Sequence, residues 1–417
     1  IINADLFKSL NPKDKQSIIA YQGGKWHDFH LFDQPCKPKT KSITLDFVMG
    51  ANEYEYNSFK VFNNSCKTCP YKVSVSELKD SNGTIAPVTI KVRYGEWVEC
   101  SDSIMRPDAL PLLDDEVSLI PGGNCEFWIS LKTNKTPAGD YCGTVSVDNG
   151  IEKEEIKMSV KVYPVTLTAP LPLATYNWSY SIFAPVKADL PAAIADLKMH
   201  YINIMTVHPS NLPRFSFDKK GRLIKSSYTK LDKLIKTCKM NGFSKFRFFC
   251  NLADIKGVDL KHPFGSLAVK TSGIKFGSPT WKNAMYNMVR DWVSHLKKIG
   301  VGYDQFTFYP FDEPRDKLLK YGAKEIMQAF KEADPNVKIF TNPINNKIEL
   351  LQGIAPYVDI WSPRYNAYKQ TDQIEQKYLN FCKNTGKKLF IYNCQGPDKL
   401  FHSLGHYRKM SWYAWKN

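Results

Sequence analysis

Arginine is scarce in this sequence, although the chain is strongly basic. Only nine of the 57 lysine and arginine residues are arginine, and the formal net charge is +16. Arginine recognises phosphates and guanine bases through its planar fork, and no basic run or nucleic-acid-binding motif accompanies the charge. We therefore expect no nucleic-acid partner and interpret the scattered lysines as solvated surface.

Several other signatures are missing. No stretch approaches the ~18 consecutive apolar residues of a membrane span. The eight histidines form no His-Glu-x-x-His pattern or other close ligand set, so the sequence predicts no metal site. No Gly-x-Ser-x-Gly element of a serine hydrolase occurs either. We expect neither a metal nor another cofactor.

The 417 residues suffice for two domains, and the first part of the chain has the pattern of β-strands. Apolar residues alternate with polar ones at 43–47, 88–92 and 156–162, and turn-forming clusters separate these stretches. Residues 1–165 are therefore predicted to form an antiparallel β-sandwich. A segment punctuated by prolines, residues 164–172, is the expected linker.

Residues 172–417 alternate between strand and helix patterns. Strands are predicted at 174–180, 202–207, 245–250, 305–309, 338–341, 358–361 and 388–392, and helices include 190–200 and 316–333. No Gly-rich phosphate loop follows the first strand, which disfavours a nucleotide-binding doubly wound sheet. The length matches the ~250 residues of a (β/α)8 TIM barrel. Only seven strands are counted, so we expect either that one strand is missed or that the barrel lacks its eighth strand in this chain.

The cysteines and glycosylation motifs favour an exported protein. Cys66 and Cys69 have zinc-knuckle spacing without a second ligand pair, so a disulfide is the favoured interpretation. Four Asn-x-Ser/Thr tripeptides occur, at Asn63, Asn82, Asn134 and Asn177. The chain opens with Ile-Ile-Asn and no signal peptide, so either a leader was removed or this is an excerpt. We expect a secreted, cell-surface or periplasmic location.

The candidate chemistry lies after the fourth barrel strand. Asp312 and Glu313 directly follow the hydrophobic strand 305–309, and catalytic groups of barrels lie at the carboxyl ends of strands. An Asp-Glu-Pro sequence is also a common way to cap the next helix, because acids stabilise a helix N-terminus. Both interpretations remain open at this point. His208, at the end of the second strand, is more often structural than a base.

The other strand ends supply aromatic and amide residues, the lining expected for a polar, ring-shaped ligand. An ordinary retaining glycosidase needs a second carboxylate ~5 Å from the acid/base, usually from a late strand. The sixth and seventh strands end without one. A single adjacent acid pair fits the substrate-assisted exception, in which the 2-acetamido oxygen of the sugar attacks the anomeric carbon.

Several elements, in this order and spacing, resemble glycoside hydrolase family 123, the β-N-acetylgalactosaminidases, over roughly residues 100–417. They are Arg-Pro-Asp-Ala-Leu-Pro-Leu at 106–112, Phe-Trp-Ile-Ser-Leu at 127–131, Pro-Ala-Gly-Asp-Tyr-Cys-Gly at 137–143, Asp-Glu-Pro at 312–314, Asp-Ile-Trp at 359–361, residues 392–397, and Arg408 with Trp412 and Trp415. The family's barrel continues beyond the position of Asn417 with a Gly-rich eighth strand.

The resemblance implies that Glu313 is the general acid/base and that Asp312 orients the acetamido group of a terminal β-linked N-acetylhexosamine, with N-acetylgalactosamine favoured. The expected partner is thus a glycan or glycoconjugate. Candidate substrate contacts are Tyr309, Trp361, Arg364, Tyr365, Tyr392, Asn393, Arg408 and Trp412. Two alternatives remain: a glycosidase of the same fold acting on another sugar, or a non-catalytic extracellular carbohydrate-binding or structural module.

Overall fold

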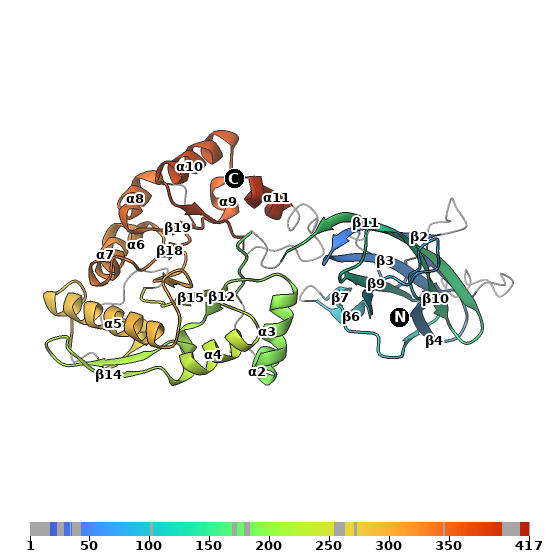
Figure 1. The fold of residues 1–417 in the computed structure, drawn as a ribbon, viewed down its shortest axis with the longest axis horizontal. Coiled ribbons are helices and arrows are strands. Elements are labelled where there is room, and N and C mark those ends of the chain that lie inside the picture. The colour runs from blue at the N-terminus through green and yellow to red at the C-terminus, as the bar shows by residue number, and fades with distance from the viewer. Residues whose placement is uncertain are drawn as a thin grey trace. The chain divides into compact units, whose positions relative to one another are not determined.

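A computed structural model of the chain describes residues 17–22, 29–33, 35, 43–100, 103–168, 173–178, 184–253, 263–270, 273–344, 347–393 and 409–416. The described residues divide into two compact units, with the boundary between residues 169 and 170. This boundary lies within the segment 164–172 that is rich in proline. Figure 1 shows that the first unit is built from strands and that the second combines strands with helices.

The first unit contains two larger sheets and a short ribbon. A four-stranded antiparallel sheet has the order β1 (Ile18–Tyr21), β3 (Tyr54–Asn63), β9 (Asn124–Thr133) and β5 (Val88–Tyr94). A five-stranded sheet has the order β2 (Thr44–Ala51), β11 (Lys153–Thr166), β10 (Gly139–Asp148), β4 (Cys69–Val75) and β8 (Glu116–Leu119), in which only β2 and β11 are parallel. The ribbon pairs β6 (Glu96–Glu99) with β7 (Met105–Ala109).

Both larger sheets contribute to one hydrophobic cluster. Leu45 and Phe47 of β2 are fully buried, as are Phe59 of β3 and Phe127 of β9, whose rings stack with centroids 5.6 Å apart. Successive side chains of a strand point to opposite faces, so every second residue enters this core while its neighbours remain polar. The alternation in the sequence therefore has a direct physical cause.

One expectation for the first unit is wrong, and one Asn-x-Ser motif is buried. Cys66 and Cys69 are free thiols, because Cys69 is buried in β4 with Sγ directed to the carbonyl of Lys67, while Cys66 is exposed in the preceding turn. Asn63 is not a suitable glycan acceptor, because its side chain is buried and its amide donates to the carbonyls of Lys67 and Leu119. Asn82 and Asn134 are exposed.

The second unit contains short parallel strands that lie side by side in sequence order. They are β12 (Met205–Val207), β15 (Phe246–Phe249), β17 (Phe306–Tyr309), β18 (Phe340–Thr341), β19 (Ile360–Trp361) and β20 (Lys388–Leu389). Isolated parallel bridges add Tyr176 beside β12 and join β17 to β18. A doubly wound sheet would instead reverse its strand order at a switch point.

The sheet of the second unit curls strongly. Tyr176 precedes β12 and Phe390 follows β20, yet their rings stack with centroids 6.1 Å apart. The Tyr176 hydroxyl also forms a 2.6 Å hydrogen bond with Ser362, which follows β19. Residues from the first and last segments of the series thus meet across the concave face, and the described strands form a curled half-barrel.

Ten helices accompany these strands in the described residues. They are α2 (Ala184–Ala188), α3 (Leu190–Met199), α4 (Thr229–Met240), α5 (Pro279–Lys298), α6 (Asp316–Tyr321), α7 (Ala323–Ala333), α8 (Ile348–Gln352), α9 (Tyr365–Tyr368), α10 (Asp372–Asn384) and α11 (Lys409–Lys416). The longest, α5, begins with Ser278, whose hydroxyl accepts from the amide of Trp281, and with Pro279 in its first turn. The predicted helix 316–333 is divided at Gly322.

The sequence analysis missed one small sheet of this unit. It has the order β14 (Leu223–Ser227), β13 (Arg214–Phe217) and β16 (Ala268–Lys270). The turn between β13 and β14 packs against α5, where the Asn287 amide donates to the carbonyl of Gly221. Strands of three to five residues are too short to show a clear alternation.

Candidate active site at the carboxyl ends of the strands

Asp312 and Glu313 lie where β17 ends. The aromatic strand Phe306–Tyr309 is almost fully buried, and the chain leaves it through Pro310 and Phe311. Both acids are half-buried, and the buried Pro314 follows them. The N-cap of α6 is Arg315, which makes no side-chain capping bond. The Asp312 carboxylate interacts with residues of the strand region instead of capping this helix.

Asp312 is held through one of its two oxygens. The Tyr309 hydroxyl donates to Asp312 Oδ1, and the Asn342 side-chain amide donates to the same oxygen at 2.8 Å. Among the described residues, Asp312 Oδ2 has no hydrogen-bond partner. The carboxylate is thus fixed at one oxygen and offers the other to a ligand.

Glu313 is held by backbone and side-chain contacts from other strands. Its amide donates to Asn342 Oδ1 at 3.0 Å, and the Tyr392 hydroxyl donates to Glu313 Oε1 at 2.7 Å. Its φ angle is +41°, in the left-handed region that residues other than glycine rarely adopt. Such conformations persist only where surrounding contacts enforce them, and they concentrate at functional sites.

Asn342 connects the two acids. It follows β18, is almost fully buried, and binds Asp312 with its amide nitrogen and the Glu313 backbone with its oxygen. Asn342 directly follows the predicted strand 338–341 but was not predicted to be a site residue.

An aromatic layer lies beneath and beside the acid pair. Tyr309 is fully buried and packs at 4.9 Å, between ring centroids, against both Phe249 and Phe340. Burial, reinforced by the neighbouring Asp312 charge, raises the pKa of the Tyr309 hydroxyl well above its usual value. The hydroxyl therefore stays protonated and remains a permanent donor to Asp312.

Trp178 is a site residue that the sequence analysis missed. It lies at the carboxyl end of the first strand segment, is half-buried, and has its ring centroid 5.1 Å from that of Phe249 and 5.7 Å from that of Tyr309. Its position two residues after Tyr176 on the concave face was the available signal, because alternate residues share a face.

Of the predicted contacts, the structure brings Tyr309 and Tyr392 to the acid pair. Arg364 and Tyr392 form a parallel bridge, which places Arg364, Tyr365 and Asn393 near the carboxyl end of β20. Among the described residues, the Nε atom of Arg364 and the side-chain oxygen of Asn393 are buried and have no hydrogen-bond partner.

Two predicted contacts are placed differently, and one cannot be evaluated. Trp361 is fully buried, packs against Phe381 of α10 and donates to Thr385, so it has no open face for a sugar ring. Trp412 is 71% exposed on α11. Arg408 lies outside the described residues.

His208 has a local structural role. It caps a short 3-10 helix, because its Nδ1 accepts from the amide of Ser210 at 3.2 Å. Burial lowers the pKa of its imidazole, which favours the neutral form that can accept this bond. Within the described part of the chain, no group of three or more His, Cys, Asp or Glu side chains is arranged to hold a metal ion. No described helix has the length and apolar character of a membrane span.

Neither the comparison with protein-family models nor that with curated proteins finds a match. Among solved structures, a family 123 glycoside hydrolase from Clostridium perfringens, studied for glycolipid glycan hydrolysis, aligns with a TM-score of 0.69. The alignment covers 95% of this chain and 76% of that chain at 13% identity. A β-glucuronidase from Bacteroides uniformis aligns over 82% of this chain and 38% of its own at 10% identity, with a TM-score of only 0.29. The resemblance seen in the sequence is thus confirmed at the level of the fold: this chain has the fold of a family 123 glycoside hydrolase.

Proposed function

We propose that the chain is a retaining glycoside hydrolase that removes terminal β-linked N-acetylhexosamine, with N-acetylgalactosamine favoured, from a glycan or glycoconjugate. The observation that carries this proposal is the acid pair Asp312 and Glu313, whose carboxyl groups are fixed by hydrogen bonds from neighbouring side chains. Asp312 and Glu313 are the only carboxylates that directly follow the strands of the half-barrel among the described residues. The shared fold with a family 123 glycoside hydrolase supports the same chemistry.

In the proposed mechanism, Asp312 positions the substrate. With Oδ1 held by Tyr309 and Asn342, Oδ2 accepts the acetamido N–H and directs the acetamido oxygen to the anomeric carbon. The C–O bond to the leaving group breaks as the acetamido oxygen forms its bond, giving an oxazolinium ion. The neighbouring carboxylate stabilises this positive charge.

Glu313 supplies and removes protons in the two steps. Protonated, it gives its proton to the departing glycosidic oxygen; as a carboxylate, it then takes a proton from the water that opens the oxazolinium ring. Tyr392 donates to Oε1 and fixes the direction of the carboxyl group. Retention of the anomeric configuration follows from two successive inversions.

We also propose that the first unit is a β-sandwich and the second a (β/α) barrel. The shared core of the two larger sheets supports a β-sandwich, and the sequential order of parallel strands supports a (β/α) barrel. We further propose that the protein is exported, and the exposure of Asn82 and Asn134 in Asn-x-Thr tripeptides fits this location.

The first test compares the hydrolysis of aryl β-N-acetylgalactosaminide, β-N-acetylglucosaminide and β-galactoside by the wild type, Glu313→Gln and Asp312→Asn. Only the acetamido sugars should be cleaved. For Glu313→Gln, kcat/KM should fall by ~10²–10⁴ with a poor leaving group and far less with dinitrophenol, which needs no protonation. For Asp312→Asn, kcat/KM should fall by ~10²–10³-fold with both leaving groups.

Glu325→Gln, an exposed acid on α7, is the matched control and should retain full activity. Cleavage of the plain galactoside at a comparable rate would rule out substrate assistance and favour a glycosidase that acts on another sugar. If the folded wild-type protein cleaves none of a wider panel of glycosides, the carbohydrate-binding module is favoured.

A further inference from the structure

A cavity lies at the amino-terminal ends of the parallel strands, opposite to the ends that carry the acid pair. Its volume is about 90 Å³, and its lining includes Lys245 before β15, Asp304 before β17, Lys338 before β18 and Lys388 at the start of β20. These positions are the amino-terminal ends of the strands, whereas Asp312 and Glu313 follow a carboxyl end. The cavity is therefore separate from the acid pair.

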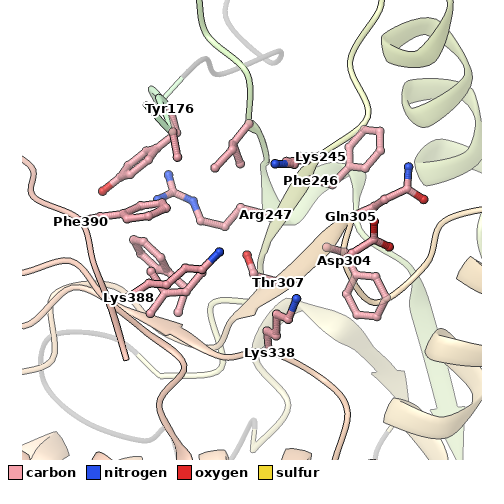
Figure 2. Close-up of a pocket in the computed structure, with 15 residues that line it drawn as sticks. Tyr176, Lys245, Phe246, Arg247, Asp304, Gln305, Thr307, Lys338, Lys388 and Phe390 are labelled. Atoms are coloured by element: carbon pink, nitrogen blue, oxygen red, sulfur yellow. The ribbon is translucent and has the colours of Figure 1, made fainter. Parts of the chain in front are cut away.

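The lining of this cavity is strongly cationic. Four positive side chains, Lys245, Arg247, Lys338 and Lys388, line it, against one acid, Asp304. No ion pair joins any of the four cations to a carboxylate of the described residues. Figure 2 shows the side-chain nitrogens of Lys338 and Lys388 within the pocket, on either side of Thr307. The electrostatic potential of the cavity must favour an anion.

Arg247 is the buried member of this group. It is only 2% exposed, its Nη2 donates to Thr206 at 2.7 Å, and within the described part of the chain its Nε has no hydrogen-bond partner. The guanidinium carbon lies 3.6 Å from the Tyr176 ring centroid and 4.4 Å from that of Phe340. Figure 2 shows the guanidinium group beside the Tyr176 ring.

This environment stabilises Arg247 incompletely. An arginine stays charged in proteins, and burying a charge is unfavourable unless it is paired and hydrogen-bonded. The aromatic faces offset part of this cost through cation–π attraction. They do not neutralise the charge, which an anion in the adjoining cavity would do.

The cavity has the size and donors for a small oxyanion. One water needs roughly 10–15 Å³ of such volume, so about 90 Å³ holds several waters or one ion of similar total size. Lysine ammonium groups bind phosphate as point charges, and their flexible stems let several of them reach different oxygens of one ion. The Thr307 hydroxyl adds a neutral donor to the lining.

We propose that this cavity is a binding site for one phosphate or sulfate group, held by Lys338 and Lys388 at its opening and by Arg247 in its interior. The site takes either the free ion or the terminal group of a small ester. Its occupation neutralises a buried cation of the half-barrel and needs no sugar in the active site.

The test is isothermal titration calorimetry of the wild type with sodium phosphate, sodium sulfate and glucose 6-phosphate, with sodium chloride at matched ionic strength. We expect one site per chain for phosphate or sulfate and no saturable heat with chloride. Binding of glucose 6-phosphate as well would identify a site open to esters, and its absence a site for the free ion. No saturable binding of any of these anions would overturn the proposal.

The deciding variant is Lys338→Met/Lys388→Met, for which the affinity should fall at least ~10-fold because two charge-assisted contacts are lost. Lys236→Met, an exposed lysine on α4, is the control and should bind like the wild type. Equal binding by the double variant and the control would overturn the site. If the double variant does not fold, Lys388→Gln decides, because Lys388 is exposed and its loss should not disturb the core; unchanged affinity would then refute the proposal.

Discussion

Asp312 and Glu313 are neighbours in the chain but have different surroundings. Asp312 is held by Tyr309 of its own strand and by Asn342, whereas Glu313 receives the hydroxyl of Tyr392, 79 residues away. Adjacent carboxyl groups can perform different steps when their environments differ. Here one group is fixed with an open oxygen, and the other is oriented by a donor from a distant strand.

At the residue scale, Asn342→Leu tests whether the two acids must be positioned together. The Glu313 amide and Asp312 Oδ1 would each lose a partner, so we expect a stability loss of about 1–3 kcal/mol. Misplacement of the acids should lower kcat/KM by roughly 10–100-fold. Stability is measured by urea unfolding and activity with the acetamido substrate.

Asn287→Leu is the matched control for this prediction, because Asn287 also donates to a backbone carbonyl, that of Gly221, far from the acid pair. It should cost comparable stability and leave kcat/KM unchanged. If both variants lose activity equally, Asn342 has only a structural role.

At the scale of elements, the stability of the second unit depends on the packing of helices against its short strands. The indole of Trp292 in α5 is fully buried and packs against Phe215 of β13, Phe248 of β15 and Phe308 of β17. One helix thus anchors both the parallel sheet and the small sheet that the sequence analysis missed. This packing explains why strands of two to five residues are stable here although their own hydrogen bonds are few.

The turn between β13 and β14 can be tested through Gly221. Its φ angle is +74°, and a Cβ there would lie 2.4 Å from the carbonyl oxygen of Thr280 in α5. Gly221→Ala should therefore cost more than the ~1–2 kcal/mol of a left-handed residue alone, since either the turn or the helix must shift.

Gly242→Ala provides the comparison, because Gly242 has a φ angle of +80° but only the Lys198 side chain near its Cβ position, at 3.6 Å. Gly242→Ala should lose only the ~1–2 kcal/mol of stability that a left-handed residue other than glycine costs. Urea unfolding measures both variants, and an equal loss would show that the turn does not press on α5.

At the scale of the whole molecule, the chain has a separate hydrophobic core in each unit. Cys69 and Cys125 are buried in the first unit, and Cys238 and Cys382 in the second. Burial raises the pKa of the Cys238 and Cys382 thiols to about 12, so they are protonated and inaccessible in the folded state.

Pulsed alkylation at increasing urea concentrations, read by mass spectrometry, should therefore expose the buried thiols unit by unit. Cys69 and Cys125 should share one urea midpoint of alkylation, and Cys238 and Cys382 should share another. The exposed Cys66 and Cys142 should react without urea and serve as internal controls. Different midpoints for Cys238 and Cys382 would show that the second unit does not unfold cooperatively.

Local patterns in the sequence determined the types of the elements and the chemistry of one strand end. Alternation predicted β2 and β11, the helical pattern at 190–200 predicted α3, and the acid pair after an aromatic strand indicated the candidate site. These features depend on neighbours in the chain, because side-chain direction follows the period of each element.

Only the tertiary structure decided which side chains converge. It directed Trp361 towards α10, placed Trp178 beside Tyr309, and brought Tyr392 and Asn342 to Glu313. The curl of the sheet and the register of very short strands set these directions, and both result from packing between segments far apart in sequence. The cationic cavity has the same origin, since its lysines come from separate strands that only the curled sheet brings together.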